Sequence, residues 1–597
     1  MTDFSPLLVA DRGQAARSIH LVDKDGFADW VKKRPAEDRT ILEAHRFEGK
    51  SAGTFALLPR GGDFEVVVAV KRADALTPWC LAKLAESLPD GTYKLASGEP
   101  GQATLGWLLG QHRFEPYRSK ADDKERGPRI LVTGEAARID AALRIADATA
   151  LVRDLVNTPA ADLGPAELER AARQLATEFA ADIRVISGDE LADGYPLIAA
   201  VGRAATAERA PRLIELEWGK PDDPRVAIVG KGVVFDSGGL DLKPASGMRL
   251  MKKDMGGAAH ALALTKLVMS ARLPVRLHLL IPAVENAVAS AAYRPGDIIR
   301  SRKGLFVEID NTDAEGRLIL ADALTKAVES QPELIVDFAT LTGAARVALG
   351  PELPAFFAND DEFAGQVLAT AKETDDPLWR MPLWDPYDEM LKSDLADLAN
   401  ASNSPMAGCI TAALFLKRFV PAEIPWSHLD TYAWRDSAQP GRPKGGEALG
   451  LRTIFAAMER RFTGARPRDW PKSLRFTSLR CNNSWPDRFR NNATRRRTET
   501  GNHERGFANG VDEGTDCLCP IRRAGPDEPP DGPADAGLPD AGPAYGSRSR
   551  PGAGRFQAGR HSRLEHLGRA RLSAPREGPG RPPQRVRRPH QQRDRFS

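Results

Sequence analysis

Two segments of the sequence place charged side chains at spacings that suit metal-dependent chemistry. Residues 226–260 read VAIVGKGVVFDSGGLDLKPASGMRLMKKDMGGAAH, and residues 307–324 read VEIDNTDAEGRLILADAL. Both segments set their charges beside apolar strand signals and glycine-rich turns, which predicts a buried and highly charged cluster. Four carboxylates, two lysines and one arginine make up the set: Lys231, Asp236, Lys243, Asp254, Asp313, Glu315 and Arg317.

Any one of these residues, taken alone, has a simpler explanation. Asp236 stands before Ser237-Gly238-Gly239, where an aspartate is usually a turn residue. Asp313 and Glu315 precede a predicted helix, and acidic groups are favourable at a helix N-terminus. The set is harder to explain in this way, because buried like charges cannot all stay ionised without compensation.

Divalent cations are the natural compensation for such a cluster. Carboxylates select hard or borderline ions such as Mg²⁺, Mn²⁺ and Zn²⁺. The sequence has no HExxH or CxxC motif that would supply another metal site. The residues by themselves therefore leave two interpretations open, a two-metal hydrolase and a purely structural charge cluster.

The elements that must position these residues alternate along the chain. Residues 226–229, 275–281 and 334–338 read as buried strands, and residues 258–270, 317–330 and 410–419 read as helices. Such alternation favours a largely parallel or mixed sheet covered on both faces. The first strand runs into Gly230-Lys231-Gly232, and ligands in such sheets commonly bind at the carboxyl ends of strands.

A separate α/β region precedes this pattern. Strands are expected at 54–58, 65–70 and 129–134, a helix at 79–87 and an exposed loop at 119–129. A helix at 136–156 follows, with Ile139, Leu143, Ala146 and Ala150 on one face. Asn157-Thr158-Pro159 ends that helix, because proline disfavours α geometry in the preceding residue. We expect domains at 1–135 and 159–462, joined by a linking helix at 136–158.

The chain changes character after Phe462. Arginine, proline and glycine become dense, lysine occurs only at Lys472, and apolar periodicity is lost. Stretches such as GPDEPPDGPADAGLPDAGPAYG cannot bury enough apolar surface to fold, which predicts a disordered tail over 463–597. We favour a translated frameshift or read-through of GC-rich DNA over a disordered basic arm that binds nucleic acid. Resequencing the coding region distinguishes the two hypotheses.

Composition excludes several other classes of protein. The formal net charge of +3 over 597 residues gives no indication of nucleic-acid binding by bulk charge. Five cysteines cannot form a disulfide scaffold, and Cys80 and Cys409 are expected to be small apolar core residues. No secretion signal and no apolar run long enough for a membrane span is visible. A cytoplasmic location is therefore expected.

The motifs resemble those of the leucyl aminopeptidase (M17) family. NTDAEGRL at 311–318 is that family's signature octapeptide, and VGKGVVFDSGGLDLKP at 229–244 and MKKDMGGAA at 251–259 resemble its other hallmarks. The resemblance covers most of 160–462 and, more weakly, the N-terminal region. It implies an α/β fold: an N-terminal α/β (macro-like) domain and a C-terminal αβα-sandwich catalytic domain with a mixed central sheet.

The resemblance also implies a role for each charged residue. Asp236 and Glu315 match carboxylates that bridge two divalent metal ions, Mn²⁺ or Zn²⁺ with Mg²⁺ as a further candidate. Lys231 and Asp254 match ligands of the tighter site, and Asp313 matches a ligand of the more exchangeable one. A lysine must be neutral to offer its lone pair to a metal.

The remaining implications concern catalysis and the substrate. Lys243 and Arg317 match the two catalytic residues. By this resemblance, Lys243 would stabilise the oxyanion and Arg317 would hold a bicarbonate ion as general base, while a metal-activated water would attack the first peptide bond. Met251, Asn311 and Thr340 match substrate-binding positions, with a broad preference for large aliphatic N-terminal residues. Plain core packing remains an alternative for Met251.

Family members are cytoplasmic homohexamers that act on peptides with a free N-terminus. Two other hypotheses remain open, a DNA-binding regulator that uses the basic tail and a catalytically inactive relative. Ser237 has no GxSxG elbow around it, and we interpret it as a turn residue rather than a nucleophile. His260 is interpreted as a structural histidine on a helix.

Overall fold

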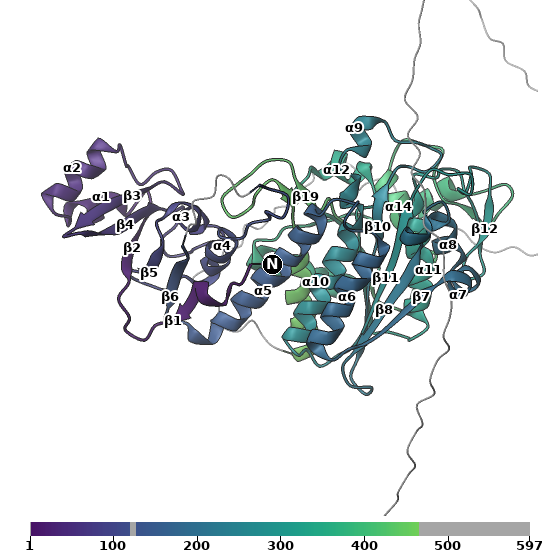
Figure 1. Ribbon diagram of the computed structural model, residues 1–597, viewed down its shortest axis with the longest axis horizontal. Coiled ribbons are helices and arrows are strands. Elements are labelled where there is room, and N and C mark those ends of the chain that lie inside the picture. Colours follow the sequence, from purple (N-terminus) through teal and green to yellow (C-terminus); the bar gives the residue numbers. More distant parts are fainter. Residues whose placement is uncertain (1, 120–126, 465–597) are drawn as a thin grey trace, which may run out of the picture. The chain divides into compact units, whose positions relative to one another are not determined.

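The computed structural model describes residues 2–119 and 127–464 (Figure 1). The tail predicted over 463–597 lies outside the described residues except for its first two positions. Most of the loop expected at 119–129 lies outside them as well. The described chain forms two large sheets with helices around each, and the helix α5 (Ile139–Asn157) lies between them in sequence.

The N-terminal sheet has six strands in the order β1-β6-β5-β2-β4-β3. The β3–β4 pair is antiparallel, and the other neighbours are parallel. Four short helices accompany it. The strands are β1 (Leu8–Ala10), β2 (Arg17–Val22), β3 (Phe55–Arg60), β4 (Asp63–Ala69), β5 (Gly91–Leu95) and β6 (Arg129–Thr133), and the helices are α1 (Phe27–Lys32), α2 (Ala36–Ala44), α3 (Ala82–Ser87) and α4 (Thr104–Leu109).

Helix α5 contributes to two hydrophobic cores. Ala146 and Ala150, on the face predicted from the sequence, are buried in the core of the N-terminal sheet. Ala148 and Val152 are buried in the core of the second sheet. A helix that is apolar on two faces can pack against both large sheets, as a helix that links them in the chain must do.

The second sheet is mixed and larger, with the order β16-β15-β18-β14-β9-β11-β8-β7 and β10 beside β11. Strands β9, β10, β11, β14 and β18 run parallel to one another, and β7, β8 and β15 make antiparallel pairs. The strands are β7 (Asp182–Ser187), β8 (Arg212–Trp218), β9 (Arg225–Gly230), β10 (Gly232–Asp236), β11 (Arg276–Asn286), β14 (Leu334–Ala339), β15 (Ala355–Ala358), β16 (Trp379–Arg380) and β18 (Trp426–Asp430). Two small sheets contain β12 (Ile298–Arg300), β13 (Phe306–Glu308), β17 (Leu398–Ala399), β19 (Trp434–Arg435) and β20 (Gly445–Gly446).

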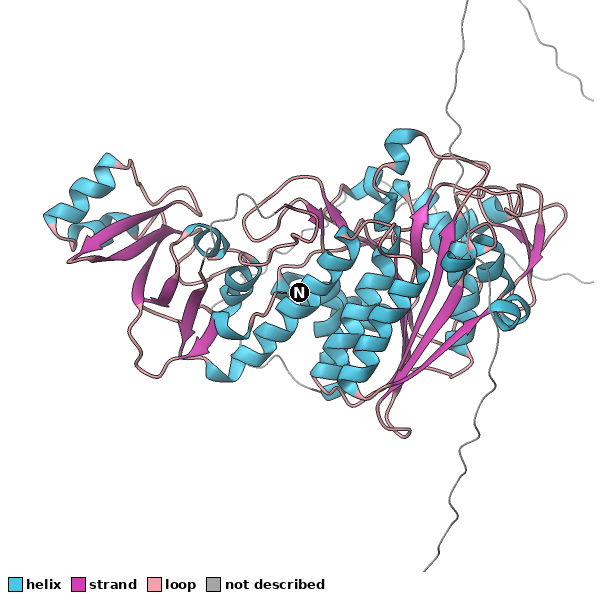
Figure 2. Cartoon of the chain, viewed as in Figure 1, coloured by secondary structure: helices cyan, strands magenta, loops and turns pink. Residues whose placement is uncertain are grey.

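Helices cover both faces of the second sheet (Figure 2). One face packs against α5, α6, α10, α13 and α15, and the other against α8, α11 and α14, with a separate apolar core on each side. The predicted αβα sandwich with a mixed sheet is therefore confirmed. The helices are α6 (Pro165–Phe179), α7 (Gly188–Gly194), α8 (Pro196–Gly202), α9 (Ala245–Met248), α10 (Gly256–Ser270), α11 (Glu315–Val328), α12 (Gly343–Leu349), α13 (Asp361–Thr374), α14 (Gly408–Lys417) and α15 (Leu451–Thr463).

Most expected elements exist, but several boundaries differ. Helix α3 begins at Ala82 rather than at 79, and α5 begins at Ile139 after a short 3₁₀ turn at Ala136–Arg138. Helix α11 begins at Glu315, two residues earlier than expected, so this carboxylate lies in its first turn. Strand β11 continues to Asn286, five residues beyond the predicted end. None of the helices in the described ranges is long and apolar enough to cross a membrane.

A buried ion pair joins α5 to the segment that leads into α15. The Arg153 guanidinium donates to both carboxylate oxygens of Glu447 at 3.0–3.1 Å, and both side chains are buried. Removing one partner of such a pair leaves a buried charge without compensation. Replacing both partners with apolar side chains of similar size leaves no buried charge and costs much less stability.

We expect the Glu447→Ala substitution to lower the free energy of unfolding by about 3–5 kcal/mol, because Arg153 stays buried without its carboxylate. Urea denaturation followed by circular dichroism measures the change. The double variant Arg153→Met/Glu447→Leu removes both charges and should recover most of the loss. A double variant as unstable as the single one would contradict this account.

His260 is held as a neutral imidazole in α10. Its Nδ1 lies 2.7 Å from the Gly256 carbonyl oxygen, and its Nε2 accepts from the Leu449 amide at 3.0 Å. Nδ1 must therefore carry the proton, and a second proton on Nε2 would face an N–H donor. Burial lowers the pKa of His260 to about 4. The sequence interpretation of a structural histidine is confirmed.

The depressed pKa of His260 predicts a pH-dependent stability. In the unfolded chain the imidazole takes up a proton near pH 6.5, whereas in the folded protein it does so only near pH 4. The stabilisation from the neutral His260 is therefore complete above pH 6.5 and is lost as the pH falls from 6.5 to about 4. The loss amounts to roughly 3 kcal/mol. We expect a His260→Gln variant to lack this component when unfolding free energies are compared at pH 7.5 and 4.5. An identical pH dependence in both proteins would rule it out.

Candidate metal centre and active site

The carboxyl ends of the parallel strands converge on one region of the second sheet. Lys231 follows β9 and donates its backbone N–H to the Phe338 carbonyl at 3.0 Å, which fixes its position beside β14. Asp236 ends β10, Asn286 ends β11 and Thr340 follows β14. Topology thus brings together residues that are more than 100 positions apart, at the edge where α/β sheets bind ligands.

Two further segments complete the cluster. A 3₁₀ helix at Met251–Met255 carries Asp254 and leads directly into α10. The loop before α11 carries Asp313, and the first turn of α11 carries Glu315. The helix N-terminus provides a favourable field for these carboxylates.

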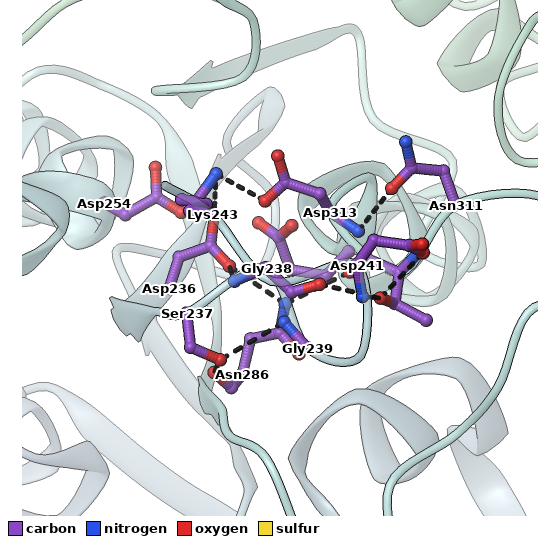
Figure 3. A network of polar contacts seen from close by, with 12 residues as sticks. Asp236, Ser237, Gly238, Gly239, Asp241, Lys243, Asp254, Asn286, Asn311 and Asp313 are labelled. Carbon is purple, nitrogen blue, oxygen red and sulfur yellow. Dashed lines mark hydrogen bonds and ion pairs between the residues drawn. The ribbon is translucent and has the colours of Figure 1, made fainter. Parts of the chain in front are cut away.

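Carboxylates and lysines alternate within the cluster. One ligand oxygen from each of Asp236, Asp313 and Glu315 can be chosen so that all three lie within 4.8 Å of one another. Lys231 Nζ lies 2.8 Å from Asp254 Oδ2 and 2.9 Å from Glu315 Oε1. Lys243 Nζ lies 2.8 Å from Asp236 Oδ2 and also contacts Asp313, as the dashed lines in Figure 3 show.

The cluster is buried as predicted, except at one position. Lys231, Asp236, Asp254 and Glu315 are buried, and Lys243 is 15% exposed. Asp313 was expected to be buried with them, but its side chain is 33% exposed. It stands on a loop ahead of the helix, at the opening rather than the floor of the cluster.

Crowding of the carboxylates shifts their pKa values. Burial raises the pKa of Glu315 to about 8, and Asp236 adds to this effect whereas Lys231 opposes it. Partial enclosure, with Asp236 beside it, raises the pKa of Asp313 to about 6. Burial also opposes ionisation of Asp254, but Lys231 and Lys253 hold its pKa below the usual range. At neutral pH, Glu315 therefore favours the protonated form, whereas Asp313 stays mostly ionised.

These residues fit a divalent metal ion. Glu315 Oε2 is buried, and within the described part of the chain it accepts no hydrogen bond. Carboxylate oxygens converge at ligand spacing, and a bound cation that replaces protons would offset both the burial and the repulsion that raise the pKa of Glu315. Lys231 is placed to offer a nitrogen ligand when neutral, because its Nζ lies against two of the carboxylates.

Arg317 stands apart from the carboxylates. Its Nη1 donates to the Asn400 carbonyl at 2.7 Å, whereas its buried Nε has no acceptor among the residues described. Burial lowers the pKa of Arg317 to about 10, so the side chain remains a cation at neutral pH. A buried guanidinium with an unused donor suits a planar anion.

The three predicted substrate-binding residues line the same cavity, of about 290 Å³, as the metal and catalytic candidates. Met251 is buried at its wall. Thr340 donates to Asp254 Oδ1 at 2.8 Å, so it also orients that carboxylate. Asn311 Oδ1 accepts from the Asp313 amide at 2.7 Å, which shapes the loop.

Several residues that support the site were not predicted from the sequence. Asn286 Nδ2 donates to Asp236 Oδ1 at 2.9 Å, and Tyr293 donates to the Thr312 carbonyl at 2.7 Å. Asn400 Nδ2 donates to the Asn311 carbonyl at 2.7 Å. A polar residue at the end of a long apolar strand is a signal that could have identified Asn286, whereas Asn400 lies in an irregular loop without such a signal.

Ser237 is part of the turn rather than a nucleophile. Its hydroxyl donates to the Asn286 carbonyl at 2.7 Å and accepts from the Gly239 amide at 3.2 Å. Gly238 and Gly239 have φ angles of +88° and +65°, which side chains rarely adopt. The sequence interpretation of Ser237 is confirmed.

Comparison with known proteins decides the family. The model of the cytosol aminopeptidase family catalytic domain matches residues 150–455, and that of the M17 aminopeptidase N-terminal domain matches residues 18–127. A probable cytosol aminopeptidase of Syntrophotalea carbinolica is 43% identical over an alignment of 371 residues, which covers 59% of this chain and 73% of the relative. The chain belongs to the cytosol aminopeptidase (M17) family.

Solved structures of M17 aminopeptidases and related enzymes resemble the fold. The cytosol aminopeptidase from Coxiella burnetii has a TM-score of 0.72 at 45% identity, covering 76% of this chain and 99% of that one. The bottromycin maturation enzyme BotP, solved in complex with Mn, has a TM-score of 0.67 at 32% identity over 76% of this chain and 99% of its own. The predicted family is confirmed, and the chain is a metallo-aminopeptidase, a hydrolase with a divalent metal cofactor.

Gly316 makes the close packing of the metal centre possible. A Cβ atom there would lie 2.6 Å from both Cε and Nζ of Lys231, a separation that real side chains do not show. Lys231 would have to leave its place between Asp254 and Glu315.

We therefore expect Gly316→Ala to lower kcat/KM for an aminopeptidase substrate about 100-fold, the scale of a 1 Å misplacement in a catalytic site. Gly247→Ala is the matched control, because the nearest atoms to its added Cβ lie at 3.7 Å. Steady-state kinetics at saturating Mn²⁺ measure both variants. Normal activity of Gly316→Ala would show that Lys231 tolerates displacement.

Proposed function

We propose that this metallo-aminopeptidase uses two divalent metal ions to release N-terminal amino acids from peptides. One observation carries the proposal: carboxylate oxygens of Asp236, Asp313 and Glu315 converge within 4.8 Å, with Lys243 on the wall of the same cavity. Three anionic groups this close suit more than one cation. We propose Mn²⁺ or Zn²⁺ as the ions, with Mg²⁺ as a further candidate.

The metal ions would be held by Lys231, Asp236, Asp254, Asp313 and Glu315. When bound, they would neutralise the carboxylates, acidify a water molecule and polarise the scissile carbonyl. Lys231 would contribute as a neutral amine, which requires the loss of its proton. Thr340 keeps Asp254 oriented through its hydroxyl, and Asn286 does the same for Asp236.

Lys243 would stabilise the transition state. Its ammonium group is held between Asp236 and Asp313, and burial alone would lower its pKa, but these carboxylates and Glu315 raise it. Lys243 is therefore a fixed cation that faces the cavity. A fixed cation aimed at a developing oxyanion lowers the barrier without reorganisation.

Arg317 would hold the general base. The bond from Nη1 to the Asn400 carbonyl fixes the guanidinium, and Nε remains as a donor. We propose that this donor binds bicarbonate, which would accept a proton from the attacking water. None of the described residues that line the cavity is a histidine, so no imidazole among them can serve as the general base.

The substrate would be a peptide with a free N-terminus. The side chain of its first residue would lie against Met251, Thr340 and Asn311, which line the cavity beside the metal centre. The apolar surface of Met251 favours large aliphatic residues such as leucine. The homohexamer and the cytoplasmic location remain predictions.

The central test uses metal-stripped protein and leucine p-nitroanilide. We expect activity to return on addition of Mn²⁺ or Zn²⁺. In the metal-restored protein, Lys243→Ala should lower kcat about 100- to 1,000-fold, as expected for loss of one oxyanion-stabilising group. Lys266→Ala should not, because Lys266 is equally 15% exposed but pairs with Glu178 outside the cavity.

The metal content of each variant separates two causes of lost activity. A Lys243→Ala protein that binds metal normally and hydrolyses the substrate at the normal rate would contradict the role of Lys243. Full activity of the stripped protein without added metal would contradict the two-metal proposal.

A further inference from the structure

The cations that line the cavity fall into two groups. Lys231 and Lys243 contact carboxylates of the metal centre, and Arg317 donates to a carbonyl. Lys253 and Arg346 line the same cavity, but among the described residues neither side chain forms an ion pair with a carboxylate. Arg346 interacts with Tyr432, and the Lys253 ammonium group has no hydrogen-bond acceptor there. The proposed chemistry uses neither of them.

Of these two cations, Lys253 is the more unusual, because it is buried. Its residue is only 3% exposed, and its Nζ lies 4.9 Å from the centroid of the Tyr432 ring. Arg346 Cζ lies 4.7 Å from the centroid of the same ring. One half-buried tyrosine thus contacts both cations, and the three side chains form a cationic patch in the cavity wall.

Neighbouring carboxylates do not neutralise this patch by direct contact. Asp254 is bonded to Lys231 at 2.8 Å and to Thr340 at 2.8 Å. Asp430 accepts from the Leu341 amide at 2.9 Å and from the hydroxyl of Thr342. Their charges attract Lys253 from a distance, but their oxygens are used elsewhere.

A buried ammonium group without a hydrogen-bond acceptor is costly. Lysine is almost never fully buried unless it is paired, and an aromatic ring replaces only part of the lost hydration. A cavity that keeps such a group discriminates between ligands, because a ligand that leaves the group unpaired binds less well. The natural complement of two neighbouring cations is a carboxylate.

Position decides which part of a substrate meets this patch. Lys253 lies two residues after Met251 in the same 3₁₀ helix, and Thr340 donates a hydrogen bond to the next residue, Asp254 of the metal centre. Met251 and Thr340 are the residues proposed above to contact the side chain of the first substrate residue. The patch therefore extends that same subsite.

We propose that Lys253 and Arg346, with Tyr432 between them, bind a carboxylate on the side chain of the N-terminal substrate residue. The enzyme would then accept peptides that begin with glutamate or aspartate as well as those that begin with leucine. This inference rests on the proposed function, because it assumes that the first side chain lies beside Met251.

The test compares p-nitroanilides of glutamate, glutamine and leucine in the full-length, metal-loaded protein. These substrates carry no C-terminal carboxylate, so a difference between glutamate and glutamine comes from the side chain alone. We expect the ratio of kcat/KM for glutamate to that for glutamine to fall about tenfold or more in Lys253→Met, the usual effect of losing a charge-assisted hydrogen bond. Arg346→Met should lower the same ratio.

Lys252→Met is the matched control. Lys252 is the adjacent lysine, but its Nζ bonds the Asn157 carbonyl and it does not line the cavity. Its ratio should equal that of the wild type. Metal content, measured on every variant, ensures that altered ligation at Asp254 is not the cause of a change.

The outcomes separate this inference from the proposed function. Hydrolysis of the leucine substrate with a glutamate-to-glutamine ratio that Lys253→Met leaves unchanged would overturn the carboxylate subsite and leave the aminopeptidase proposal intact. If leucine is not hydrolysed, the proposed function fails. Calorimetry then still tests the subsite, because free L-glutamate should bind the wild type more tightly than L-glutamine does, and Lys253→Met should abolish the difference. Equal binding of the two amino acids would overturn it.

Discussion

Electrostatic repulsion among buried carboxylates is the constraint around which this fold is organised. Asp236, Asp254 and Glu315 are buried, and Asp313 lies at the opening of the cluster. Two lysines offset part of the charge, yet the pKa of Glu315 still rises to about 8. A fold keeps such a cluster only where a ligand uses it, since well-packed apolar residues would be at least as stable. Divalent cations are the ligand that this donor set fits.

The sheet meets this constraint by its topology. Parallel strands end at the same edge, so β9, β10, β11 and β14 deliver a lysine, an aspartate, an asparagine and a threonine to one place. Helix α11 brings Glu315 at its positive end, and Gly316 leaves room for Lys231 beside it. Backbone geometry and neutral donors such as Asn286 therefore hold the site residues in place. The charged side chains can then face the cavity.

Much of this arrangement could be predicted from the sequence, because local signals carry it. Apolar runs such as 226–229 identify the central strands, and the motif NTDAEGRL marks the loop and helix that hold Asp313 and Glu315. Contacts between distant segments were not predictable in the same way. Asn400 contacts the site from an irregular loop. Lys253 resembles any lysine in a KKD run until the structure shows its side chain buried, with no hydrogen-bond acceptor among the residues described. The exposure of Asp313 also depends on a loop path that periodicity does not encode.

Diffraction from crystals of the full-length protein grown with Mn²⁺ tests the central claim most directly, because anomalous scattering locates the metal without reference to activity. We predict two anomalous peaks per chain, both enclosed by Asp236, Asp254, Asp313 and Glu315, with Lys231 beside one of them. Crystals that contain Mn²⁺ but show no peak among these carboxylates would contradict the assignment of the cluster as a two-metal centre.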